Sequence, residues 1–246
     1  MFADFSERRR EAEWMDDPTL DEREHARALH GLARINAVSR TSAALWPIVA
    51  RIAAAHPERR LSLLDVACGG GELAVSLASR ARRRGLALDV SGCDISPVAL
   101  RYADARAAAK TVSVRFFRLD ALSDPIPADY DIAVTTLFLH HLSNAEIAAL
   151  LARFARHADH LLVSDLLRGP LAYALAWAGT HLLSASPVVH MDGLRSVRAA
   201  LSMSEVRALA EEAGLSGVCL KHSWPRRFLL HWSRMDAVPA GGANAA

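Results

Sequence analysis

The sequence predicts an α/β fold built on a doubly wound, mostly parallel sheet. From residue 61 onward, apolar runs of strand length alternate with segments of helical periodicity. Glycine and Ser-Pro signals mark the boundaries between these segments. The chain has 246 residues, of which 52% are hydrophobic, and this is enough to bury the core of such a sheet.

Residues 1–58 are predicted to form a helical extension ahead of the sheet. Thr19-Leu20-Asp21-Glu22 has the spacing of a capping box, and apolar residues recur at helical intervals after it. A second apolar set, from Leu45 to Ile52, predicts another helix that ends before His56. Plain packing against the edge of the sheet would account for both helices.

Residues 59–235 are predicted to contain the sheet. Helical segments connect the early strands, and such crossovers favour parallel pairing. The last two strands are separated only by a turn around Pro225, so the sheet is expected to close with a hairpin. The seven predicted strands lie at residues 61–66, 88–93, 112–118, 130–136, 159–165, 217–221 and 227–232.

Capping signals predict where the intervening helices begin and end. Gly85 follows the first of them, and Ser96-Pro97 begins the second. Ser143 to Glu146 has capping-box spacing, and Ser202 to Glu205 opens a last helix that ends near Gly214.

Residues 166–200 are predicted to be a cap inserted on the substrate side. The stretch from Leu171 to Val189 has no formal charge and nearly reaches the ~20 residues that cross a bilayer. Since strands on both sides of it should share one sheet, a helix and a loop are expected instead. This apolar segment would either contact an apolar substrate or pack on the core. The Ala- and Gly-rich tail, residues 236–246, is expected to be disordered.

Charge and cysteine content exclude several classes of protein. The formal net charge is +2, and the basic run from Arg80 to Arg84 coincides with a predicted helix end, so no nucleic-acid partner is expected. The three cysteines are widely separated and no metal-ligand spacing is present, so no metal is expected. The amino terminus lacks an apolar signal core, which together with the free cysteines favours a cytoplasmic location.

A glycine-rich turn after the first strand is the main functional signal. The run from Asp65 to Gly71 has neither Gly-Lys-Ser/Thr nor Gly-x-Gly-x-x-Gly spacing, which disfavours a triphosphate or a dinucleotide. Asp94 ends the second strand, where a carboxylate can accept hydrogen bonds from ribose hydroxyls. A glycine turn that lacks a phosphate-binding motif, followed by an acidic residue placed to bind ribose, predicts S-adenosylmethionine.

These features resemble the class I S-adenosylmethionine-dependent methyltransferases over about residues 60 to 165. The resemblance implies a Rossmann-like sheet with an antiparallel last strand, and an amino-terminal extension over the cofactor mouth. Ala67 stands where the family usually has glycine. Asp65 could alternatively cap the turn, Asp94 could cap the next helix, and Asp120 could belong to a plain turn. The implied cofactor-binding residues are Asp65, Ala67, Gly69, Gly71, Asp94, Ile95, Asp120, Ala121 and Thr136.

Two histidines are candidate catalytic residues. Methyl transfer needs an unprotonated nucleophile, and a histidine with a pKa of about 6.5 could accept its proton. His140 follows the fourth strand at the ligand-binding edge, and His190 lies in the cap, where Asp192 could orient its ring. His140 could instead be part of a pocket wall, and His190 could lie in a surface loop. Asp165 and Arg168, just past the fifth strand, are expected with Asp192 to contact the substrate.

The predicted function is S-adenosylmethionine-dependent O-methylation of a phenolic, quinol or polyketide-like small molecule, in secondary or lipid metabolism. Resemblance to the ubiquinone and menaquinone type of methyltransferases favours this acceptor class. C-methylation of an aromatic or polyketide acceptor, and a non-methylating S-adenosylmethionine-binding protein of the same fold, stay open. The expected partner is an apolar or aromatic acceptor, with no transmembrane segment, and a homodimer is compatible with the sequence.

Overall fold

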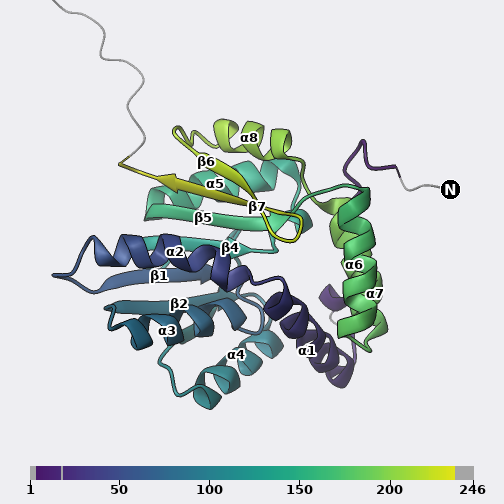
Figure 1. Ribbon diagram of the computed structural model, residues 1–246, viewed down its shortest axis with the longest axis horizontal. Coiled ribbons are helices and arrows are strands. Elements are labelled where there is room, and N and C mark those ends of the chain that lie inside the picture. The colour runs from purple at the N-terminus through teal and green to yellow at the C-terminus, as the bar shows by residue number, and fades with distance from the viewer. Residues whose placement is uncertain (1–3, 18, 236–246) are drawn as a thin grey trace, which may run out of the picture.

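Seven strands form one mixed sheet in the order β3-β2-β1-β4-β5-β7-β6 in the computed structural model, which describes residues 4–17 and 19–235 (Figure 1). Strands β1 to β5 pair in parallel, and β7 runs antiparallel to both of its neighbours. The predicted fold class is therefore confirmed. The strands are β1 (Leu61–Val66), β2 (Leu88–Asp94), β3 (Arg115–Arg118), β4 (Tyr130–Thr136), β5 (Ala158–Leu166), β6 (Cys219–Ser223) and β7 (Arg227–Ser233).

Alternating side chains of the central strands build a core on each face of the sheet. Leu63 and Ile132 pack toward α2 (Thr41–Ala54) and α3 (Glu72–Arg84). Leu64 packs on the opposite face, in the cluster that includes residues of α5 (Asn144–His157) and α8 (Met203–Glu212). This two-sided burial explains why the strands are continuous apolar runs in the sequence.

Most predicted helix boundaries agree with the structure. Gly85 ends α3 with a φ of 65°, and Ser96 caps α4 (Pro97–Ala109). Capping boxes begin α5 at Ser143 and α8 at Ser202. The capping box expected at Thr19 is wrong, because the Asp21 carboxylate accepts the first N–H groups of α1 (Glu22–Val38).

Two predicted strands differ from the observed ones by two or more residues at an end. The strand expected from residue 112 begins at Arg115, because the Val112 N–H still bonds to Ala107 O at the end of α4. The strand expected at 217–221 lies at 219–223, since Gly217 has a φ of 72° and belongs to the preceding turn.

The cap consists of two helices, α6 (Pro170–Leu183) and α7 (Pro187–Ala199), which pack against each other and against α1 (Figure 1). The expected helix and loop is thus corrected, and His190 lies within α7. Among residues 4–17 and 19–235, no helix is both long and apolar enough to span a membrane. The division into an extension, a sheet domain and a cap stays a prediction. The predicted disordered tail lies outside the described residues.

Candidate active site

A cavity of about 600 Å³ lies where the glycine turn meets helices α1, α6 and α7. Its volume is in the range of small-molecule sites, and much of its wall is apolar. The glycine turn and the segment after β4 form one side, and helices form the other. The cavity is lined on the sheet side by Ala67, Gly69, Thr136 and His140, and elsewhere by residues that include Gly179 and Arg227.

The glycine turn presents its backbone to open space. A Cβ placed on Gly69 would meet nothing within 4 Å, and the Gly69 N–H donates to Asp94 Oδ2 at 2.8 Å. Ala67 has a φ of 54°, a left-handed conformation that explains why glycine suits this position. A Cβ on Gly71 would lie 2.8 Å from the Ala103 side chain, so glycine there allows α4 to pack closely. The open backbone next to a carboxylate fits an adenosyl amino acid.

Asp65 lies behind this turn. It is 1% exposed, and its Oδ2 accepts a hydrogen bond of 3.1 Å from the Ala74 N–H in α3. Burial raises the pKa of its carboxyl well above the ordinary value. Asp65 therefore holds the turn against the first part of α3 and does not line the cavity.

Three predicted cofactor-binding residues lie outside the cavity: Asp120 and Ala121 follow β3, and Ile95 follows β2. The Asp120 carboxylate accepts from the Leu122 N–H at 2.9 Å and from the Ser123 hydroxyl at 2.7 Å. These bonds hold the pKa of Asp120 below its ordinary value and form a local turn. Ile95 is 56% exposed and Ala121 is buried. The loop adjoins Asp94, because the Leu119 N–H donates to Asp94 O.

His140 and Asp165 form a buried pair at the cavity wall. His140 Nδ1 lies 2.7 Å from Asp165 Oδ1, and the His140 backbone N–H donates to Oδ2 at 3.2 Å. Burial acts to raise the pKa of Asp165, but the charge and hydrogen bond of His140 hold it below the ordinary value. Because Asp165 accepts the Nδ1–H of His140, Nε2 carries the lone pair when the imidazole is neutral.

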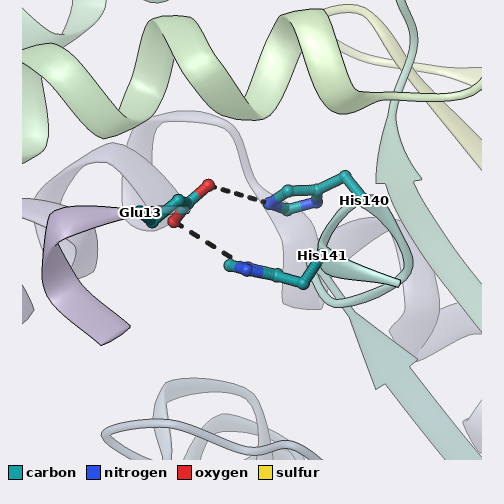
Figure 2. A group of neighbouring side chains, drawn as sticks. All are labelled: Glu13, His140 and His141. Carbon is teal, nitrogen blue, oxygen red and sulfur yellow. Dashed lines mark ion pairs between the residues drawn. The ribbon is translucent and has the colours of Figure 1, made fainter. Parts of the chain in front are cut away.

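Glu13 enters the same region from residues 4–17, which we call the N-terminal strap. Its Oε1 lies 3.7 Å from His140 Nε2, and its Oε2 lies 3.9 Å from His141 Nε2 (Figure 2). Arg8 anchors the strap by donating to the carbonyls of Leu139 and His140 at 2.9 and 3.0 Å. Sequence reasoning missed Glu13, because no local motif relates it to histidines more than 120 positions away.

Sequence reasoning also missed Arg227, at the start of β7. It is 3% exposed, and burial lowers the pKa of its guanidinium to about 10. Its Nη1 donates to Thr41 Oγ1, and its Nη2 donates to Asn36 Oδ1 at 3.4 Å. The cavity thus has a buried cation in an otherwise largely apolar wall.

The other predicted catalytic and substrate residues do not line the cavity. His190 Nε2 bonds to Ser184 O at 2.8 Å, and its ring stacks on His181 at 4.1 Å. Asp192, expected to orient His190, instead accepts the backbone N–H groups of Trp14 and Met15 in the strap. Both side chains are engaged in holding the cap and strap together, so of the two predicted catalytic histidines only His140 lines the cavity.

Arg168 is a structural residue as well, with its side chain 5% exposed. It donates to Phe5 O at 2.9 Å and to Ala200 O at 2.7 Å, and it pairs with Glu205 through both terminal nitrogens. It therefore joins the strap, α7 and α8.

The Arg168–Glu205 pair predicts a pH dependence of stability. Burial opposes ionisation of Glu205, but bonds from Arg168 and Ser202 lower its pKa from 4.5 to about 2. A carboxyl whose pKa is depressed by folding stabilises the fold above its unfolded pKa, and this contribution fades as the pH falls from 4.5 toward 2. Glu205→Gln should cost about 1 kcal/mol at pH 7 after allowance for solvent screening, and less at pH 3. Urea unfolding at both pH values tests this, and an equal loss at both would contradict it.

Residues 63–160 match a family model described as a methyltransferase domain. The ubiquinone biosynthesis O-methyltransferase of Burkholderia pseudomallei strain K96243 is 32% identical over 176 residues, which cover 68% of this chain and 72% of that enzyme. The enzyme of the same name from Cupriavidus pinatubonensis is 30% identical over 157 residues, covering 62% of this chain but less than two thirds, 59%, of its own length.

Solved structures share the fold at low sequence identity. A plantazolicin methyltransferase in complex with a desmethyl substrate analogue and S-adenosylhomocysteine has a TM-score of 0.62 at 13% identity, covering 87% of this chain and 99% of that one. The magnesium protoporphyrin IX methyltransferase of Synechocystis PCC 6803 has a TM-score of 0.55 at 19% identity, covering 78% and 83%. Given the sheet order, the glycine turn beside Asp94 and a relative at 32% identity over most of its length, the chain belongs to the class I S-adenosylmethionine-dependent methyltransferases.

Proposed function

We propose that the protein methylates a hydroxyl group of an apolar or aromatic small molecule of the phenolic, quinol or polyketide-like class. The observation that carries this proposal is the cavity itself, which joins the glycine turn to a largely apolar chamber and is lined by His140, whose ring is paired with Asp165. The names of the relatives, which are O-methyltransferases, point to the same reaction.

The glycine turn and the ends of β2 and β4 would hold the cofactor. When bound, S-adenosylmethionine supplies a methyl group on a sulfonium, which is an activated leaving group. Asp94 already accepts from Gly69 and Ser96, but each carboxylate oxygen can accept a further bond from a ribose hydroxyl. Asp120, Ile95 and Ala121 would lie on the adenine side, and Thr136 near the acceptor. Asp65 would act by holding the turn in shape.

The acceptor would occupy the chamber between the turn and the cap. His140 Nε2 would accept a hydrogen bond from the reacting hydroxyl, with Asp165 keeping the ring in the correct tautomer. Arg227 would donate to a second oxygen of the acceptor, which suits a hydroxylated ring better than a pure hydrocarbon. Holding the acceptor oxygen in line with the breaking C–S bond supplies much of the rate acceleration, with effective molarities worth about 7 to 11 kcal/mol in favourable cases.

Transfer from methyl-labelled S-adenosylmethionine to a panel of apolar phenols and quinols tests the function. We expect a methyl ether, identified by mass spectrometry and NMR, and no label in oligonucleotides or proteins. A product methylated on ring carbon would establish the C-methyltransferase alternative. Cofactor binding without any product across the panel would favour a non-methylating protein.

Gly179 in α6 offers a test of where the acceptor binds. It lines the cavity, and a Cβ placed on it meets nothing within 4 Å, so a larger side chain would project into free space. Gly179→Leu should raise the acceptor KM about tenfold, a loss in the range of a blocked hydrophobic contact, and leave the cofactor Kd unchanged. The matched variant Gly179→Ala should keep the KM and increase the free energy of unfolding by about 1 kcal/mol. An unchanged KM in the leucine variant would place the acceptor elsewhere.

A further inference from the structure

Three potential metal ligands converge at the wall of the cavity. Glu13 comes from the N-terminal strap, and His140 and His141 come from the 3-10 turn after β4, η2 (Leu139–His141). One ligand atom from each residue can be chosen so that all lie within 4.8 Å of one another (Figure 2). The side chains of Glu13 and His140 are only 12% and 5% exposed, so the cluster is held by the fold.

The arrangement places electron-rich atoms opposite one another. His140 Nδ1 is committed to Asp165, so the lone pair of Nε2 points toward Glu13 Oε1 at 3.7 Å. That separation is too long for a hydrogen bond. His141 Nε2 lies 3.9 Å from the other carboxylate oxygen of Glu13, and the two imidazole rings are 4.3 Å apart. A positive charge between these atoms would make the contact attractive.

His140 and Glu13 have outer partners of the kind that metal ligands need. Asp165 accepts from Nδ1 of His140, and such a carboxylate–histidine pair orients the ring and increases its basicity as a ligand. The Ser196 hydroxyl, which also lies 2.7 Å from Asp192 O, is 2.5 Å from Glu13 Oε1. Ser196 in the cap therefore positions the Glu13 carboxylate, and Asp165 in the sheet positions the His140 imidazole.

We propose that Glu13, His140 and His141 bind one divalent transition-metal cation at the wall of the acceptor chamber. Two imidazoles and one carboxylate suit Zn²⁺, Fe²⁺ or Mn²⁺, and three protein ligands leave coordination positions open for water or an acceptor oxygen. The Glu13–histidine separations of 3.7 and 3.9 Å, which involve different carboxylate oxygens, and the spread of up to 4.8 Å among the three ligand atoms exceed the about 3.3 Å expected between tetrahedral zinc ligands. Binding of the cation would therefore draw the Glu13 carboxylate and the two imidazoles closer together.

This inference deepens the proposed function and rests on it for its chemical consequence. An acceptor hydroxyl bound to the cation would release its proton to solvent more readily, because the cation stabilises the oxyanion. The oxyanion would then attack the sulfonium methyl group. A C–O bond forms, the C–S bond breaks, and sulfur leaves as a neutral thioether with the electron pair. The cation would replace the direct hydrogen bond from the hydroxyl to His140.

Binding of Co²⁺ tests the site independently of catalysis. After dialysis against EDTA and removal of the chelator, the full chain should bind one equivalent of Co²⁺, with the visible absorption of a nitrogen- and oxygen-ligated ion. Glu13→Gln and His141→Ala should each weaken binding at least tenfold. Asp165→Asn should weaken it about 10- to 100-fold by removing the partner of His140. Glu7→Gln, an exposed acid in the same strap, is the matched control and should bind as the wild type does.

The outcomes separate the site from the proposed function. Absence of saturable Co²⁺ binding, or equal affinity in Glu13→Gln, His141→Ala and the wild type, would overturn the metal site. Thermal unfolding of each variant checks that the fold is retained. If Co²⁺ binds as predicted but no acceptor is methylated, the site stands and the proposed function fails. If the EDTA-treated protein binds no added Co²⁺ and still forms methyl ethers at the rate of the untreated protein, the function stands and the site fails.

Discussion

Asp94→Ala is expected to weaken binding of S-adenosylmethionine about 100-fold, equivalent to about 3 kcal/mol. The substitution removes the carboxylate proposed to accept the ribose hydroxyls, and charge-assisted hydrogen bonds are the stronger kind. It also releases the N–H groups of Gly69 and Ser96, which Asp94 holds at 2.8 and 2.9 Å, so the turn loses its preformed shape. Isothermal titration with the cofactor and with its demethylated product measures the loss.

Asp89 provides a matched control on the same strand. It lies in β2, is exposed, and pairs with Arg60 at 3.1 Å, remote from the carboxyl end of the strand that Asp94 occupies. Asp89→Asn should leave cofactor affinity unchanged. Thermal unfolding of Asp94→Ala separates loss of the site from loss of the fold. Equal affinity in a folded Asp94→Ala protein would contradict the assignment of the glycine turn as the cofactor site.

Asp165→Asn is expected to lower kcat about 100-fold or more with little effect on cofactor affinity. An amide cannot stabilise the Nδ1–H tautomer of His140 as a carboxylate does, so Nε2 would more often carry the proton and could not accept one from the acceptor or bind a cation. Loss of general acid–base assistance of this kind typically costs 10²- to 10⁴-fold. Steady-state kinetics with a methylated phenol as product measures kcat, and titration calorimetry measures the cofactor Kd.

Asp159 is the matched control for this substitution. It belongs to the same strand, β5, but it is exposed and pairs with Arg234 at 3.2 Å. Asp159→Asn should retain full turnover. If Asp165→Asn also retained it, the His140–Asp165 pair would serve only to hold η2 against β5, and the reacting hydroxyl would have to be activated by another group.

The N-terminal strap changes how the site is understood. Arg8 binds the carbonyls of the segment that carries both histidines, and Glu13 directs one carboxylate oxygen toward each imidazole (Figure 2). Asp192, which the sequence pattern associates with His190, instead accepts two strap N–H groups. The strap and the cap therefore complete the chamber together, and neither would do so alone.

Local patterns were sufficient to predict the sheet and the edge at which the site forms. Strand limits for β1 and β4 follow from short apolar runs, and the capping boxes at Ser143 and Ser202 depend on residues three positions apart. Asp94 and Gly69 come together because parallel neighbouring strands end at the same edge.

The sequence by itself determined the fold class, the glycine turn and the family, because hydrophobic periodicity and capping act over a few residues. Only the tertiary structure decided which acids meet which histidines. Asp165 reaches His140 across 25 positions, Arg227 is buried against Thr41, and Glu13 meets His140 and His141 through the strap. Such pairings depend on how the strap, cap and sheet pack, and packing between distant segments leaves no period in the sequence.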